Sequence, residues 1–343
     1  PSGGTIELLP HFEPGHPEPP YLWLANGNYL YNLTVNAGTS AYLLQSHIYM
    51  KGSLTINSGE LWANLGIIEI EGDWTNNVAN SFHHDLKTVR FIGDGPSEIA
   101  SDEVFYNVYI DKYGSSVEDV VIAAGKTIQV LNNLEVNNGT LEVNSSATLG
   151  VGNDLTLKTG AGLNAGGEDV LVTLNMSGDF IDNNTSATST KGFFAGTSSV
   201  VFDGTVDQEV ISGGTSESFY NLEIDKPSGN FIPSTNLNVL HDLLITDGLF
   251  YNLTDRSHQL YRNLSIQPDG QFLPYGTFTF AGSEAATFQD LGSATSVFEN
   301  VIVNKETELN LLNPMTLMNG GDLIIQQGTV YINGTTLGVS GDV

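Results

Sequence analysis

Short runs in which apolar and polar residues alternate recur along the chain from about Tyr21 onward. Leu54-Thr55-Ile56 and Ile68-Glu69-Ile70 are two examples, and Gly, Asn, Asp and Ser separate the runs. This period of two is typical of β-strands that bury one face. We find no convincing segment that combines a helical spacing of apolar residues with capping residues. The pattern therefore predicts an all-β protein.

One short motif occurs four times: an aromatic residue or Leu, any residue, Asn, and then Leu or Val. The asparagines of this motif are Asn32, Asn107, Asn221 and Asn300, which are 75, 114 and 79 residues apart. Self-similarity at such spacings indicates a repeat architecture.

Other landmarks recur at fixed places around these asparagines. A Phe-x-Gly strand precedes the last three copies, and a lysine follows the asparagine in the same three, at Lys112, Lys226 and Lys305. A Leu-x-Ile/Val-x-x-Gly segment comes next and ends at Gly59, Gly139, Gly248 and Gly328. A Gly-Asp-apolar triplet then contributes Asp73, Asp179 and Asp342.

The landmarks divide the chain into four degenerate units of about 75–80 residues. The second unit carries an extra strand pair, and the fourth is incomplete at Val343, which predicts a fragment of a longer array. Six of the twelve prolines fall within the first twenty residues, which predicts a linker or an N-terminal cap. The predicted segments are 1–28 for the linker or cap and 29–87, 88–198, 199–276 and 277–343 for the repeat units.

Two folds agree with these repeats. The first is a parallel β-helix, or β-solenoid, in which inward Leu, Ile and Val stack as columns and Gly and Asn occupy the corners. Asparagines at equal places would form a hydrogen-bonded ladder in such a fold. The alternative is a series of tandem β-sandwich domains. We favour the β-solenoid, because a solenoid absorbs an extra strand pair easily and a sandwich does not.

Composition excludes several classes of function. The 343 residues carry a formal net charge of −28 and contain no cysteine. Strong acidity argues against partners made of nucleic acid and against anionic membranes. No apolar run is long enough for a transmembrane helix, so we expect no membrane insertion. The absence of cysteine removes disulfides, thiolate metal ligands and thiol nucleophiles.

The repeats resemble those of large secreted or cell-surface proteins of Bacteroidota-type bacteria. The third copy carries the resemblance best, with Phe202, Gly204, Gln208, Asn221 and Lys226 in their expected places. The resemblance implies a β-helical stalk or adhesin that is exported by a type IX-like route and displayed outside the cell. It implies no catalytic site, because the shared motif is a structural repeat.

Candidate sites in the sequence are weak, and each has a structural interpretation. We expect the three repeated lysines to lie on the surface at strand ends, paired with carboxylates or protecting an edge. The alternative is a row of cations for an acidic glycan.

Asp73, Asp179, Asp182 and Asp342 are the candidate ligands for Ca²⁺, the one possible cofactor, although aspartates in turns ordinarily bond their own backbone. His83, His84 and Asp85, and the histidines and glutamates of the Pro-rich segment (His11, Glu13, His16 and Glu18), are weaker candidates for a metal.

These observations favour a non-catalytic extracellular or cell-surface rod that acts as an adhesin or stalk for a glycan or protein ligand. One alternative is a polysaccharide lyase or hydrolase built on a β-helix, which would need carboxylates grouped on one face. Another is a filament subunit or a passenger of an outer-membrane secretion or motility machine.

Overall fold

The computed structural model describes residues 3–9, 20–24, 28–64, 66–113, 119–166, 172–252, 254–318 and 320–343. The strand pairings whose register the structure describes are parallel, and the described residues contain strands and turns but no helix. The protein is therefore all-β and folds as a β-solenoid, as the alternation and the repeats predict. The described part has about 14 turns. The Pro-rich segment with His11, Glu13, His16 and Glu18 lies outside the described residues.

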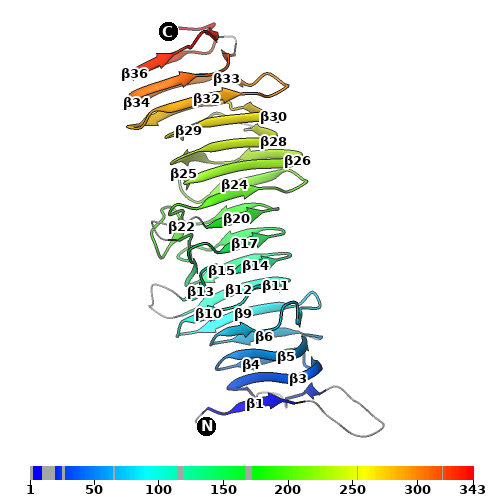
Figure 1. Cartoon of the computed structure of the whole chain (residues 1–343). Helices are drawn as coiled ribbons and strands as arrows, with labels where there is room; N and C mark the ends of the chain where they lie inside the picture. The colour runs from blue at the N-terminus through cyan, green and yellow to red at the C-terminus, as the bar shows by residue number, and fades with distance from the viewer. Residues whose placement is uncertain are drawn as a thin grey trace. The chain divides into compact units, whose positions relative to one another are not determined.

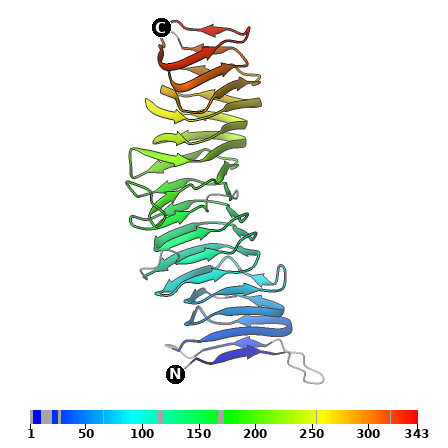
Figure 2. The ribbon, with the colours of Figure 1, turned by 60° about the vertical axis from the view of Figure 1, so that its left-hand side comes forward.

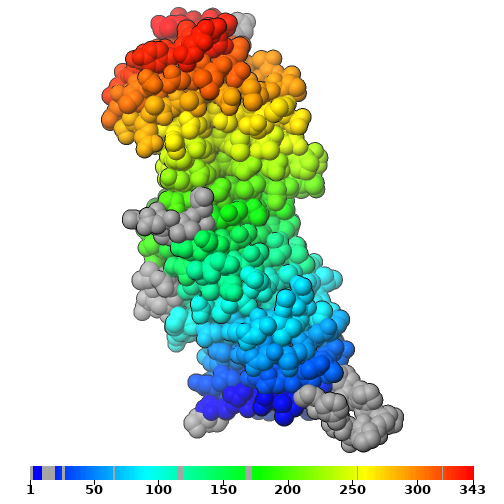
Figure 3. All heavy atoms as spheres, viewed as in Figure 1, coloured from blue at the N-terminus to red at the C-terminus, as the bar shows by residue number. Residues whose placement is uncertain are grey.

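The chain divides into two compact units. Unit 1 comprises residues 1–172 and 187–194, and unit 2 comprises residues 173–186 and 195–343. Successive strands of either unit follow one another as rungs (Figures 1 and 2). On the visible face, the atoms of neighbouring coils within a unit lie in contact (Figure 3).

Unit 1 contains two runs of stacked strands. One follows the order β1-β3-β5-β7-β10-β13-β16-β19-β22, and the other includes β4-β6-β9-β12-β15-β18. The strands of unit 1 are β1 Thr5–Leu8, β2 Tyr21–Leu22, β3 Asn32–Leu43, β4 His47–Met50, β5 Leu54–Trp62, β6 Ile67–Ile70, β7 Trp74–Asn76, β8 Phe82–His83, β9 Thr88–Gly93, β10 Ser97–Ile99, β11 Glu103–Phe105, β12 Asn107–Lys112, β13 Val120–Ile122, β14 Thr127–Val130, β15 Leu134–Asn138, β16 Thr140–Val143, β17 Thr148–Val151, β18 Leu155–Leu157, β19 Gly162–Asn164 and β22 Gly192–Phe194.

Unit 2 repeats the arrangement. One run follows β20-β23-β26-β28-β30-β32, and β25-β27-β29-β31-β34-β36 forms another. The strands of unit 2 are β20 Thr173–Met176, β21 Phe180–Asp182, β23 Ser199–Phe202, β24 Gln208–Ser212, β25 Ser216–Phe219, β26 Asn221–Pro233, β27 Asn236–Val239, β28 Leu243–Tyr251, β29 Arg256–Leu260, β30 Leu264–Leu273, β31 Gly276–Gly282, β32 Ala286–Asp290, β33 Val297–Phe298, β34 Asn300–Leu311, β35 Met315–Leu317, β36 Leu323–Tyr331 and β37 Leu337–Gly338.

The core of each unit consists of apolar columns that run from coil to coil. Side chains on a strand alternate between faces, and a parallel register places each inward residue against its counterpart in the next coil. One column of unit 1 is Ile48, Ile68, Val89, Val108, Leu134 and Leu155, all buried. One column of unit 2 is Val200, Leu222, Leu243, Leu264 and Phe288, also buried. Removal of these side chains from water is the main stabilising contribution.

Candidate functional site

The repeated asparagines join neighbouring coils at a corner. In each copy the side-chain Oδ1 accepts a hydrogen bond from the backbone N–H that directly precedes a buried leucine of the next coil. The donors and distances are Ser53 to Asn32, 2.9 Å; Asn133 to Asn107, 3.2 Å; Asp242 to Asn221, 3.4 Å; and Asp322 to Asn300, 3.1 Å. The ladder is thus made mainly of side chain to backbone bonds, which satisfy corner N–H groups that have no ladder partner.

The three repeated lysines are buried, so the expectation of surface residues at strand ends is wrong. Lys112, Lys226 and Lys305 are each 0% exposed. The Nζ of Lys226 donates to Gly204 O at 2.8 Å, to Val206 O at 2.7 Å and to Gln208 Oε1 at 2.6 Å. Desolvation by burial lowers the pKa of Lys112 and Lys226 to about 8, and it also lowers the pKa of Lys305.

The lysine and the Phe-x-Gly strand recur together because they meet in adjacent coils. Lys112 donates to Gly95 O at 2.8 Å, Lys226 to Gly204 O, and Lys305 to Ala281 O at 2.6 Å. These acceptors lie in or just after the Phe-x-Gly segment of the preceding coil. The first copy has no such segment, and the buried Ala37 takes the place of the lysine there. The lysines therefore act as internal caps for carbonyl groups at a turn.

The four repeated glycines have left-handed backbone conformations at equivalent positions. Their φ angles are +81° at Gly59, +85° at Gly139, +84° at Gly248 and +91° at Gly328. A Cβ at Gly248 would lie 2.7 Å from Lys226 O and 2.9 Å from Lys226 Cβ. The glycine thus combines a conformation that L-residues avoid with direct contact to the lysine of the previous coil.

The aspartates predicted as calcium ligands take part in the same coil-to-coil bonding. Asp73 Oδ1 accepts the N–H of Glu98 at 2.9 Å, and Asp179 Oδ1 accepts that of Glu209 at 2.7 Å. They bond the backbone of the next coil, whereas we expected them to bond the backbone of their own turn. The N–H of Asp342 donates to Asp322 Oδ1 at 2.8 Å.

Asp182, the fourth aspartate, is buried, and its Oδ1 accepts the N–H of Asn184 at 2.9 Å. Within the described ranges, no group of three or more His, Asp or Glu side chains has the arrangement of a metal site.

Two buried glutamates were not among the candidate residues predicted from the sequence. Glu103 and Glu217 each precede the phenylalanine of the repeat motif by two residues, so the alternation places them on the buried face. The Oε2 of Glu103 accepts hydrogen bonds from Trp74 Nε1 at 2.9 Å and Asn76 Nδ2 at 3.0 Å. Burial raises the pKa of Glu103, and burial together with the charge of Asp182 raises that of Glu217 to about 8.

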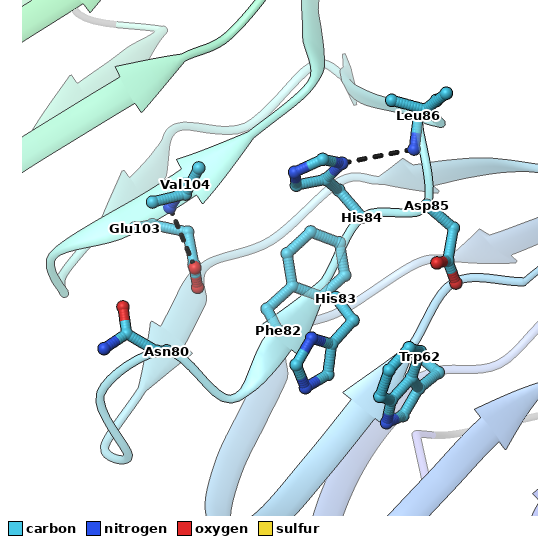
Figure 4. Close-up of a pocket in the computed structure, with 9 residues that line it drawn as sticks. All are labelled: Trp62, Asn80, Phe82, His83, His84, Asp85, Leu86, Glu103 and Val104. Carbon is cyan, nitrogen blue, oxygen red and sulfur yellow. Dashed lines mark hydrogen bonds between the residues drawn. The ribbon is translucent and has the colours of Figure 1, made fainter.

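A surface pocket in unit 1 is the best candidate for ligand binding. Its volume is about 450 Å³, within the usual range for small-ligand sites. Figure 4 shows the residues that line it: Trp62, Asn80, Phe82, His83, His84, Asp85, Leu86, Glu103 and Val104. The sequence singled out His83, His84 and Asp85 only as weak metal candidates. The contribution of Trp62 and Glu103 from other coils depends on the coil register, which the sequence does not display.

An aromatic column ends at this pocket. Register pairs Tyr42 with Trp62 and Trp62 with His83. The ring centroids of Tyr42 and Trp62 are 6.0 Å apart, and the angle between the ring planes is 25°. The centroids of Trp62 and His83 are 3.8 Å apart, with an angle of 22° between the planes. Both arrangements are stacked, and each is within the range of favourable ring pairs or close to it.

Backbone strain is concentrated at the same pocket. Asn80, Asp85 and Leu86 have φ angles of +57°, +46° and +60° and all line it. Asn and Asp tolerate this conformation, but a leucine does not favour it, and Leu86 is 64% exposed. Strain of this kind persists where the surrounding structure holds it, which is common at functional sites.

Two polar side chains of the pocket, His84 and Asp85, differ in their hydrogen bonding. The Nδ1 of His84 accepts the N–H of Leu86 at 3.2 Å, and burial lowers the pKa of His84, so its imidazole is neutral with the proton on Nε2. The Oδ2 of Asp85 is buried and has no hydrogen-bond partner in the described part of the chain. The lining of the pocket thus includes a carboxylate oxygen without a described partner and an imidazole N–H.

The fold and these contacts define a parallel β-solenoid protein whose repeated polar residues hold its coils together. No protein-family model matches the chain, and comparisons with curated proteins and with solved structures give no match. Among the residues described, no helix has the length and apolar character needed to cross a membrane.

Proposed function

We propose that this chain is a non-catalytic rod segment of an exported protein, displayed at the cell surface as an adhesin or stalk. The observation that carries the proposal is the use of the repeated polar residues. The repeated lysines and asparagines bond neighbouring coils, so the repeat serves the scaffold. The resemblance to secreted Bacteroidota-type repeat proteins agrees with this role.

Enzymatic cleavage of a polysaccharide is the competing function, because Glu103 and Asp85 both line the pocket. A glutamate with a raised pKa could serve as a general acid. However, both carboxylate oxygens of Glu103 already accept hydrogen bonds, from Trp74, Asn76 and the backbone of Val104. Glu217 repeats the same buried position in unit 2. These two facts favour a structural role for Glu103.

Adhesion of protein-coated beads tests the proposal. Beads that carry the full chain and beads that carry albumin are passed over surfaces coated with neutral polysaccharides, acidic polysaccharides or extracellular-matrix proteins. The proposal predicts that chain-coated beads resist detachment by flow on at least one surface, whereas albumin-coated beads are washed away. Equal detachment of both kinds of bead on every surface would contradict it.

A further inference from the structure

We propose that the pocket of unit 1 binds one pyranose residue of a neutral glycan, stacked on His83 as the next ring of the aromatic column. The inference deepens the proposed adhesive function and rests on it. It depends on where the column ends, on the polar atoms at that end, and on the charge around it.

The column ends because β8 has a neighbour on one side only. Register pairs Phe82 and His83 of β8 with Leu61 and Trp62 of β5, and the described strands supply no partner on its other side. One face of the His83 ring stacks on Trp62, with the ring centroids 3.8 Å apart. The pocket of about 450 Å³ is lined by His83 and, from the next coil, by Glu103 and Val104. Neither of these two side chains is a ring, so the described residues do not continue the stack beyond His83. A flat ring from a ligand can take that position.

A pyranose matches both the ring and the polar atoms. Its axial C–H groups form an apolar face that stacks on an aromatic ring, and its hydroxyl groups donate and accept hydrogen bonds around the edge. Asp85 lines the pocket, and a turn of its carboxylate would bring Oδ2, which is buried without a described hydrogen-bond partner, to a hydroxyl donor. The Nε2–H of His84 is a donor for a hydroxyl oxygen, because Nδ1 already accepts the Leu86 N–H. A purely apolar ligand would leave Asp85 Oδ2 unsatisfied.

Charge favours a neutral glycan over an acidic one. Glu60 accepts hydrogen bonds from Ser40 Oγ at 2.9 Å and Trp62 Nε1 at 3.1 Å, and these bonds lower the pKa of its carboxyl group. An ionised Glu60 therefore lies beside the stacked rings, on a chain of net charge −28. Uronate groups would be repelled from this surface.

Tryptophan fluorescence offers a local signal for binding. The chain has three tryptophans, of which Trp74 is fully buried and Trp23 is 67% exposed. Trp62 lines the pocket and stacks on His83. The full chain with Trp23→Phe therefore reports on Trp62 and on Trp74, which packs on Phe82 and donates to Glu103 of the same pocket. It is titrated with cellohexaose, N-acetylchitohexaose, mannohexaose or polygalacturonate.

The proposal predicts saturable fluorescence changes with at least one neutral hexasaccharide and none with polygalacturonate. His83→Ala removes the stacking ring, and Asp85→Asn replaces one carboxyl oxygen by an amide NH2 group but keeps a residue that tolerates the positive φ. Each is expected to weaken binding by about two- to thirteenfold, since a stacked ring or a hydrogen bond contributes about 0.5–1.5 kcal/mol.

Two matched variants serve as controls. His47→Ala removes an exposed histidine of unit 1 that pairs with Glu69 at 2.7 Å, and Asp94→Asn neutralises an exposed aspartate. Both are expected to leave the affinity unchanged.

Three results would overturn the inference: no neutral hexasaccharide changes the fluorescence, polygalacturonate binds as well as a neutral glycan, or His83→Ala and Asp85→Asn bind as the parent does. If chain-coated beads still adhere in any of these cases, the proposed function stands and only its assignment to this pocket fails.

Discussion

Lys226→Met is the most informative single perturbation of the scaffold. Methionine has a similar length and fills the buried space, but it cannot donate hydrogen bonds. In the parent protein, Lys226 Nζ donates to Gly204 O, Val206 O and Gln208 Oε1 at 2.6–2.8 Å. The variant thus tests whether the repeated lysine stabilises the coil from inside.

The expected loss of folding stability depends on which hydrogen bonds each acceptor keeps in the variant. Gln208 Oε1 still accepts the N–H of Gly204 at 2.8 Å, and Val206 is 65% exposed, so water can reach its neighbourhood. Gly204 O loses the donor described above, and an unsatisfied buried carbonyl costs about 1–3 kcal/mol. Two further lost bonds contribute about 0.5–1.5 kcal/mol each. The free energy of unfolding is therefore expected to fall by about 2–6 kcal/mol.

Urea unfolding followed by circular dichroism measures this loss. Lys158→Met is the control, because the Lys158 side chain is 48% exposed and its Nζ lies 3.5 Å from Glu135, a surface pair that contributes about 0–1 kcal/mol.

The pH dependence gives a second readout. The pKa of Lys226 is about 8 in the folded chain and about 10.5 when unfolded, so the unfolded chain binds more protons between these values. The gap between parent and Lys226→Met should widen from pH 8 to pH 10 and stay constant below pH 8. A loss no larger than that of Lys158→Met would refute the reasoning.

Three other variants or conditions test neighbouring parts of the account. Glu217→Gln removes a carboxyl group that takes up a proton on folding between pH 4.5 and 8, so the parent should lose about 1.4 kcal/mol per pH unit relative to the variant from pH 5 to pH 7; a pH-independent difference in urea unfolding would contradict this. Gly248→Ala should destabilise by at least about 2 kcal/mol, and more than Gly320→Ala, which has a similar φ but open space for a Cβ; equal thermal shifts would argue against the contact with Lys226. Ca²⁺ followed by EDTA should leave the melting temperature unchanged, because Asp73 and Asp179 bond backbone N–H groups; a saturable rise with Ca²⁺ would contradict this and support calcium binding.

The period of two and the repeated corners were sufficient to predict the solenoid. Leu, Ile and Val at alternate positions, with Gly and Asn between the runs, determine both the strand type and the stacking of like residues. The burial of the lysines was also within reach of the sequence. Leu222, Ile224 and Lys226 alternate with polar residues and so share a face, yet the general preference of lysine for the surface outweighed the local period.

The pocket could not be predicted in the same way. It depends on β8, which has a described neighbour on one side only, and on three residues with positive φ that are not glycine. Asn80 and Asp85 are common in turns, but no pattern marks Leu86 as left-handed. Two other residues that line the pocket, Trp62 and Glu103, come from other coils. They reach the pocket because of the register between coils that differ in length.

The central proposal for the pocket of unit 1 is that it holds a neutral glycan without cleaving it, and one chromatographic measurement tests both parts of this proposal. The full chain is immobilised, a fluorescently labelled neutral hexasaccharide is passed over it, and the eluted sugar is analysed by mass. The account predicts delayed elution of intact hexasaccharide, with a shorter delay on a column of the His83→Ala variant. Elution of shortened sugars, or elution with no delay for every neutral hexasaccharide tried, would contradict it.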